Sequence, residues 1–239
     1  MEYEALLFDL DGTLIDFDFQ DFIKIYLGAA SQFFLDLIPN PEIFYKELLL
    51  STDVMENTDN DNTTTLEDFL LDFCPKFDVD CDKIQERFLQ FYQTKYEVIK
   101  PLIETFEGAL SLLQDIRSRY PSLKIVLATN PVFPYIAIKQ RMKWGGIPED
   151  LFNLITHAQN STYCKYNDKY WFEISEKMDI DPKKSLVIGN DGNRDMRAKK
   201  CGFRTFLLES NLENEEMITA ETEPDYRGSI EDLYELLIG

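Results

Sequence analysis

The sequence predicts an α/β protein: a doubly wound parallel sheet with an all-helical segment inserted after the first strand. Three observations predict this class. Short apolar runs typical of buried parallel strands recur along the chain, the first of them at 6–8. From Lys100 onward, strand patterns alternate with helix patterns. Between 17 and 98 the apolar residues recur at helical spacing, and no strand pattern interrupts them.

The first strand lies in the segment "ALLFDLDGTLID", where an apolar run at 6–8 leads directly into two aspartates. Gly12 then ends the pattern. Because Asp9 and Asp11 alternate with Leu10, their carboxylates face the same side of an extended chain. Two like charges held together cost free energy unless a cation lies between them. The segment therefore predicts a bound cation at the end of the first strand.

The inserted segment is predicted to consist of helices. Phe22, Tyr26 and Phe33 lie on one face of the first of these helices. A polar stretch at 52–65 is expected to form a mobile loop. Thr65 and Asp68 then have the spacing of a capping box. The predicted helices cover 19–38, 65–74 and 80–99. A further helical segment is expected to begin at Pro41.

The second half of the chain is predicted to complete the sheet. Pro131 suits the first turn of a helix, and the glycine pair at 145–146 ends that helix. Strands are expected at 123–130, 151–157, 185–191 and 203–209, and helices at 105–120, 131–146, 167–178, 194–202 and 229–238.

Polar side chains follow successive strands of this predicted sheet. In an open parallel sheet, ligands bind outside the carboxyl ends of the strands, so these residues are expected to converge. Carboxylates suit Mg²⁺, while hydroxyl, amide and ammonium groups suit phosphoryl oxygens. Lys169 lies one helical turn beyond Lys165 as a competing cation. The converging residues are Asp9, Asp11, Thr129, Asn130, Lys165, Asp191 and Asp195.

Composition excludes several kinds of partner. The 239 residues carry a formal net charge of −20, which repels nucleic acid and anionic membranes. No apolar run approaches the roughly 18 residues that a membrane span requires. The N-terminus has no basic segment before its apolar run, so no signal peptide is expected. The acidic stretches at 51–68 and 209–225 are expected to be solvated surface.

The cysteines and the single histidine give no metal pattern. Because the four cysteines form no CxxC pair, zinc is disfavoured, and reduced thiols in a cytoplasmic protein are expected. His157 is expected to be a structural or loop residue. The aromatic residues of the inserted segment are expected to form helix core rather than a substrate box. The residues concerned are Cys74, Cys81, Cys164 and Cys201, and the aromatics Phe22, Phe33, Phe34, Phe88, Phe91 and Tyr92.

The order of four motifs resembles that of the haloacid dehalogenase superfamily. "DLDGT" is followed by "LATN", then by Lys165, and then by "GNDGNRD", so the resemblance covers essentially the whole chain. It implies a Rossmann-like catalytic core formed by 1–16 and 99–239. The helices of 17–98 resemble the family's helical (C1-type) cap domain.

The resemblance also implies roles for individual residues. Asp9 would attack phosphorus and form an aspartyl-phosphate, and Asp11 would act as general acid and then as general base. Thr129 and Lys165 would bind phosphoryl oxygens, helped by Asn130 and by backbone N–H groups near Gly12. Mg²⁺ would be held by Asp9, the carbonyl of Asp11 and Asp191. Asp195 would either support these ligands without touching the metal or contact a water molecule bound to it. The choice of inner-sphere ligand between Asp191 and Asp195 stays open.

These roles favour a Mg²⁺-dependent phosphatase acting on a small phosphorylated metabolite. A haloalkanoate dehalogenase needs no leaving-group acid at the position of Asp11, which argues against that reaction. A phosphomutase uses the same residues and stays open. A phosphonatase would need a Schiff-base lysine in the cap, for which Lys24, Lys46 and Lys95 are available. A non-catalytic phosphate-binding or regulatory protein is the alternative from a different class.

Overall fold

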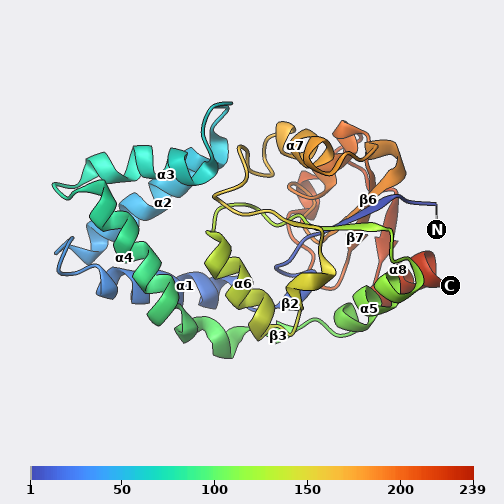
Figure 1. The fold of residues 1–239 in the computed structure, drawn as a ribbon, viewed down its shortest axis with the longest axis horizontal. Helices are drawn as coiled ribbons and strands as arrows, with labels where there is room; N and C mark the ends of the chain where they lie inside the picture. The colour runs from blue at the N-terminus through green and yellow to red at the C-terminus, as the bar shows by residue number, and fades with distance from the viewer. Residues whose placement is uncertain (1) are drawn as a thin grey trace.

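A computed structural model describes residues 2–239 (Figure 1). Six parallel strands form one sheet in the order β5-β4-β1-β6-β7-β8, so the first strand lies inside the sheet and its neighbours come from distant parts of the chain. This arrangement confirms the predicted doubly wound α/β class. The strands are β1 (Ala5–Phe8), β4 (Lys124–Leu127), β5 (Leu154–Ile155), β6 (Ser185–Gly189), β7 (Arg204–Leu208) and β8 (Tyr226–Gly228).

Helices cover both faces of this sheet. In Figure 1, α7 lies on one side of the sheet, and α5 and α8 lie on the other. The fully buried strand β1 shows why both faces need cover: Leu6 and Phe8 belong to one apolar core, while Ala5 and Leu7 belong to a second core with Trp171. The helices here are α5 (Ala109–Arg119), α6 (Tyr135–Trp144), α7 (Lys169–Met178) and α8 (Ile230–Ile238).

The remaining helices lie together beside the sheet, at the left in Figure 1. They lie in the chain between β2 (Ile15–Asp16) and β3 (Glu104–Thr105), which pair antiparallel as a separate two-stranded sheet. This pair and β8 were not predicted, because two- and three-residue strands are too short to show a pattern. The helices are α1 (Phe19–Phe33), α2 (Pro41–Asn57), α3 (Thr65–Phe73) and α4 (Cys81–Thr94).

Short 3₁₀-helices account for several boundary errors. The helix predicted at 194–202 is the 3₁₀-helix η5, and the predicted helix at 80–99 gives way to η2 after Thr94. The 3₁₀-helices are η1 (Cys74–Lys76), η2 (Tyr96–Leu102), η3 (Glu149–Leu151), η4 (Pro182–Lys184), η5 (Met196–Cys201) and η6 (Glu215–Met217). Within residues 2–239, no helix is both long and apolar enough to cross a membrane.

The polar stretch predicted as a loop is partly helical. Helix α2 continues to Asn57, because Ser51 and Met55 are buried on its inner face. The capping box of α3 lies one residue earlier than predicted, with Thr64 as the N-cap and Glu67 as its partner. The next residue, Thr65, links α3 to the core: its hydroxyl donates to the carbonyl of Pro131 at 2.7 Å.

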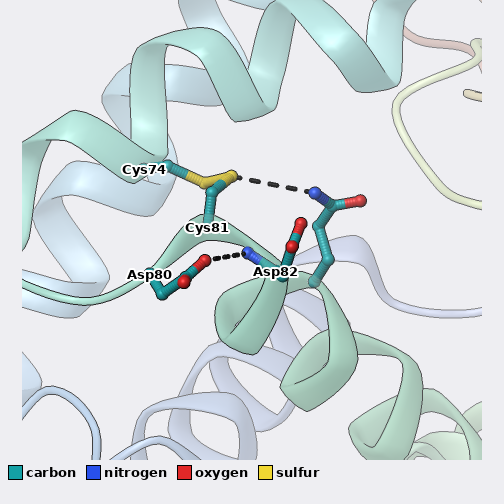
Figure 2. The surroundings of a disulfide bond; sticks show 5 residues. Cys74, Asp80, Cys81 and Asp82 are labelled. Carbon is teal, nitrogen blue, oxygen red and sulfur yellow. Dashed lines mark hydrogen bonds between the residues drawn. A yellow bond between two sulfur atoms is a disulfide. The ribbon is translucent and has the colours of Figure 1, made fainter.

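The prediction that all four cysteines are reduced was wrong. Cys74 and Cys81 form a disulfide that joins the end of α3 to the start of α4, with their Cα atoms 5.3 Å apart (Figure 2). Figure 2 also shows Asp80, the N-cap of α4, accepting from the backbone N–H of Asp82 at 2.9 Å. The tight turn between the two helices, rather than a recognisable spacing, brings the cysteines together. Cys164 and Cys201 are free and buried.

Reduction of this disulfide is expected to lower the free energy of unfolding by about 2 kcal/mol, the loop-closure entropy for so short a loop. Urea unfolding with and without dithiothreitol measures the difference. The matched control is the Cys74→Ser/Cys81→Ser double variant, whose unfolding should not respond to dithiothreitol. A thiol titration of the unfolded protein without reductant should find only Cys164 and Cys201. Four reactive thiols there would contradict the assignment.

Candidate active site

The parallel register brings the strand ends to one edge. Phe8 pairs with Leu127 on one side and with Ile188 on the other, so the polar residues that follow each strand lie close together. A cavity of about 1140 Å³ opens at this edge. Its wall includes every site residue predicted from the sequence: Asp9, Asp11, Gly12, Thr129, Asn130, Lys165, Asp191 and Asp195.

Lys165 is the central cation of this cavity. Its ammonium lies 2.5 Å from Asp9 Oδ1 and 2.6 Å from Asp195 Oδ1, and its side chain is only 2% exposed. Lys169, the competing candidate, is exposed and pairs with Asp59 and Asp61. The structure therefore places Lys165, and not Lys169, between the carboxylates.

Burial dominates the electrostatics of this cluster. It raises the pKa of Asp9, against the opposing attraction of Lys165 and with the repulsion of Asp11. It also raises the pKa of Asp195 to about 7, again opposed by Lys165. The pKa of Lys165 is held above its ordinary value because the pull of Asp195 and Asp9 exceeds the effect of burial. Burial, more than repulsion between the carboxylates, is therefore the cause of the raised carboxyl pKa values.

Asp11 has a different partner, Arg141 of α6. The Asp11 Oδ2 atom lies 3.1 Å from Arg141 Nη2, while Asp11 Oδ1 is buried with no hydrogen-bond partner in the described chain. Burial raises the pKa of Asp11, and the Arg141 charge opposes that rise. Arg141 is itself buried: it donates to the Tyr96 hydroxyl at 3.0 Å and stacks on Phe133.

Arg141 was not predicted as a site residue, because an arginine on the apolar face of a helix does not reveal its partner in the sequence. Its contact with Asp11 depends on how α6 packs against the first loop. A charged residue among the apolar positions of α6 was the one signal available.

The loop after β1 requires a glycine. Gly12 has a φ of 81°, and a Cβ atom there would lie 2.4 Å from the Asn190 side-chain nitrogen. Thr13 donates from its hydroxyl to Asn190 Oδ1 at 3.1 Å, which ties the loop to the end of β6. The Gly12 N–H donates to the Ile15 carbonyl at 2.7 Å, so this group is not free for a phosphate.

Thr129 lines the cavity with an available hydroxyl. Its backbone carbonyl accepts from the Thr156 hydroxyl at 2.7 Å and from the Tyr170 hydroxyl at 2.9 Å. Its own hydroxyl makes no hydrogen bond to any residue in 2–239. Both polar atoms of the Asn130 side chain already make a hydrogen bond: Oδ1 accepts from the Lys165 backbone N–H at 3.1 Å, and Nδ2 donates to Glu56 Oε1 at 2.7 Å.

Glu56 was missed because it lies in an acidic stretch predicted to be solvated surface. It comes from α2 and lines the cavity, where its Oε1 also accepts from Arg194 Nη2 at 3.2 Å. Asn211 and Glu213, from the second acidic stretch, line the cavity as well. The prediction that both stretches are wholly solvated surface was therefore wrong. Only the tertiary packing shows which acids face inward.

Asp191 and Asp195 have different surroundings. Asp191 Oδ1 accepts from the backbone N–H groups of Asn193 and Arg194 at 2.8 and 2.9 Å, and Asp191 Oδ2 accepts from Asn214 at 2.9 Å. Asp195 uses one oxygen for Lys165 and the other for the Asp191 N–H, at 3.0 Å. Asp195 is therefore committed to holding Lys165 and the turn after β6.

Gly189→Ala is expected to disrupt this arrangement, since a Cβ atom there would lie 2.1 Å from Asp195 Oδ2. Asp195 must move and release Lys165, at a cost of about 1–3 kcal/mol in unfolding free energy. Gly28→Ala is the control: nothing lies within 4 Å of its added Cβ, and alanine in α1 should stabilise by up to about 1 kcal/mol. Chemical denaturation of both variants measures the contrast. Equal stabilities would show that Asp195 is not fixed.

The donor atoms fit a hard cation such as Mg²⁺. Asp9 Oδ2 and the backbone carbonyl of Asp11 accept no hydrogen bond from residues 2–239, so both oxygens are open to a metal ion. No three His, Cys, Asp or Glu side chains converge as a ready-made metal cluster in the described part of the chain. Mg²⁺ usually binds one or two carboxylates and completes its shell with water and phosphate oxygens, which is the chemistry that this site offers.

Some candidates from the sequence lie away from the cavity. The His157 ring bonds to Gln159 and does not line the cavity wall. Lys24, Lys46 and Lys95 are all exposed, and none of them lines the cavity. Of the helix aromatics, Phe88 and Tyr92 both pack in the core and line the cavity, whereas Phe22, Phe33, Phe34 and Phe91 only pack in it.

A family model for haloacid dehalogenase-like hydrolases matches residues 3–201. The chain belongs to this family. The predicted resemblance is thereby confirmed, and the enzyme is a hydrolase. No curated protein matches this hydrolase.

Solved structures of three different reaction types share the fold of this hydrolase. A predicted phosphoglycolate phosphatase from Haemophilus somnus has a TM-score of 0.61 at 16% identity, covering 99% of this chain and 98% of its own. A proposed β-phosphoglucomutase from Thermotoga maritima has a TM-score of 0.58 at 16% identity, covering 98% of both chains. An L-2-haloacid dehalogenase has a TM-score of 0.59 at 13% identity, covering 100% of both chains. At such identities the likeness establishes the fold and does not select a reaction.

Proposed function

We propose that this hydrolase is a Mg²⁺-dependent phosphatase that acts on a small phosphorylated metabolite through an aspartyl-phosphate on Asp9. One observation carries the proposal. Asp9 and Asp11 share one cavity, yet each faces its own cation, Lys165 for the first and Arg141 for the second. Two carboxyl groups in different surroundings can take different roles, one as nucleophile and one as proton donor.

In the proposed reaction, the carboxylate of Asp9 attacks phosphorus and the bond to the leaving oxygen breaks. Asp11 gives its proton to that oxygen, and burial favours the protonated form because it raises the pKa of Asp11. Water then attacks the aspartyl-phosphate while Asp11 takes up a proton, and inorganic phosphate leaves. Lys165 and the free hydroxyl of Thr129 would stabilise charge on the phosphoryl oxygens.

Asp9, the carbonyl of Asp11 and Asp191 would hold Mg²⁺, which neutralises charge on the phosphoryl group when bound. Asp195 would instead keep Lys165 in place, since its Oδ1 lies 2.6 Å from the Lys165 ammonium and its side chain is 1% exposed. We assign the inner-sphere position to Asp191, because its side chain is more exposed, at 8%, and its nearest cation, Arg194, lies 3.7 Å away.

The proposed domains are those predicted: a core of 1–16 and 99–239, and a helical cap of 17–98. The cap would exclude water and admit only small substrates, because residues of α1–α4 form part of the cavity wall. The cytoplasmic location predicted from the sequence stays part of the proposal. The Cys74–Cys81 disulfide is the feature that points instead to an oxidising compartment.

Different features bear on each alternative function. Asp11 argues against a dehalogenase, which does not need a proton donor at that position. A phosphonatase needs a buried cap lysine, whereas Lys24, Lys46 and Lys95 are exposed. A phosphomutase shares the residues and is distinguished by its product. A non-catalytic binding protein has no need of the complete set of Asp9, Asp11, Thr129, Lys165, Asp191 and Asp195.

The test is phosphate release from a panel of small phosphate esters, with Mg²⁺ and with EDTA, by the wild type and by Asp9→Asn. We expect release that requires Mg²⁺ and falls by at least about 10³-fold in the variant, because an amide cannot form the acyl-phosphate. Transfer of phosphate to a second substrate hydroxyl would identify a mutase. A folded protein that releases nothing from any ester would refute the proposal.

A further inference from the structure

Helices α1–α4 give the cavity a largely apolar wall. Each of the four contributes large apolar side chains, among them three that are substantially exposed, Phe19 at 50%, Leu49 at 40% and Leu89 at 49%. Such a surface gains free energy by removing an apolar group of a ligand from water. Representative wall residues are Ile23, Leu27, Met55, Phe69, Phe88 and Leu89.

The same wall offers no unpaired cation for a second anion. Among the described residues that line the cavity, the cations are Lys165 and Arg194, and both lie outside α1–α4. Lys165 is paired with two aspartates, and Arg194 is paired with Glu56. The other charged residues of the wall are acidic: Asp16, Asp18, Asp53, Glu86 and Glu213 accompany Glu56 and the catalytic aspartates. A carboxylate or second phosphate on the leaving group would meet repulsion there.

Glu56 stands where this wall meets the phosphate end of the cavity. Its side chain is 15% exposed, and its Oε1 accepts from Asn130, the residue next to Thr129 in the chain. Its Oε2 accepts no hydrogen bond from residues 2–239, although it belongs to a residue that lines the cavity. A carboxylate oxygen in this position can accept from a donor on the leaving group, and most strongly from an ammonium.

We propose that the substrate is a phosphate monoester of an apolar amino alcohol, and that Glu56 binds the amine. The leaving group carries no carboxylate and no second phosphate. The inference rests on the proposed phosphatase function and assigns that function a substrate class. It excludes carboxylated esters such as the one named for the Haemophilus somnus protein, although the folds are alike.

Three esters of one carbon skeleton test this class. They are 3-phenylpropyl phosphate and its derivatives with an amino group or a carboxyl group at carbon 2. We expect kcat/KM for the amino ester to exceed that of the parent by at least about tenfold, and that of the carboxyl ester to fall at least about tenfold below the parent.

Two variants test whether side chains of the cavity wall cause these differences in kcat/KM. Glu56→Gln should reduce the amino-to-parent ratio to about two or less, whereas the control Glu86→Gln, at another acid of the wall, should leave it within threefold. Leu89→Lys should raise the carboxyl-to-parent ratio at least about tenfold, because it adds the missing cation.

The outcomes separate the two proposals. If esters of the general panel are hydrolysed, but the three test esters react equally, not at all, or best with the carboxyl group, the substrate class is wrong and the phosphatase function stands. If the amino-to-parent ratio of kcat/KM is the same in Glu56→Gln as in the wild type, Glu56 does not bind the amine. If neither the panel nor the three esters release phosphate, the phosphatase function itself fails.

Discussion

Lys165→Met is expected to lower kcat for phosphate release by about 10²–10³-fold and to destabilise the fold. The loss of activity follows because the substitution removes a buried ammonium that lies beside the proposed nucleophile Asp9. The loss of stability follows because Asp9 and Asp195 are left buried without their cation, which costs about 3–5 kcal/mol. Steady-state kinetics and urea unfolding without Mg²⁺ measure the two effects.

Two controls make this result specific. Lys169→Met removes an exposed lysine that also bonds to two aspartates, and it should change stability by less than about 1 kcal/mol. The double variant Lys165→Met/Asp195→Asn should recover part of the stability and none of the activity, because it removes a buried charge but does not restore the ammonium. Full stability in Lys165→Met alone would mean that Lys165 does not hold the two carboxylates together.

Arg141→Met is expected to cost about 2–4 kcal/mol of unfolding free energy and to reduce kcat by about 10–10²-fold. Methionine keeps much of the side-chain volume but leaves Asp11 without its cation, and one oxygen of Asp11 already has no hydrogen-bond partner. The Tyr96 hydroxyl loses its donor as well. The pKa of Asp11 should rise further, since Arg141 opposes the effect of burial.

Lys143→Met serves as the control, because Lys143 lies on the same helix and is exposed. It should leave both quantities nearly unchanged. Arg141→Lys keeps the charge but not the paired geometry, so it should recover more stability than activity. If Arg141→Met had wild-type activity, the pairing with Asp11 would have no part in the reaction.

Much of the fold could be predicted because its signals are local. The apolar run of β1 and the alternation after Lys100 follow from side-chain periodicity, and the parallel sheet follows from them. The pair β2 and β3 could not be predicted in this way, because two residues show no period. The extension of α2 to Asn57 depends on burial against α3, which outweighs a polar local composition.

The residues of the site also fall into two groups: those that local sequence patterns predict, and those that only tertiary packing brings to the cavity. Asp9, Thr129 and Asp191 were predictable because each lies within two residues of a strand end, and parallel strand ends share one edge. Arg141 and Glu56 reach the cavity from helices, where the direction of a side chain depends on tertiary packing. The disulfide also depends on a turn between two helices, and the separation of its cysteines carries no recognisable pattern.

The link from Thr65 to the Pro131 carbonyl has a consequence for the speed of the proposed reaction. It is one of several hydrogen bonds between the start of α3 and the core; the Thr65 N–H donates to the Ser161 carbonyl at 2.9 Å and the Leu66 N–H to the Ala158 carbonyl at 3.0 Å. These bonds must break before α3 can swing away from the core. If substrates enter by that motion, the frequency of opening sets an upper limit on turnover, however fast the chemistry at Asp9 is.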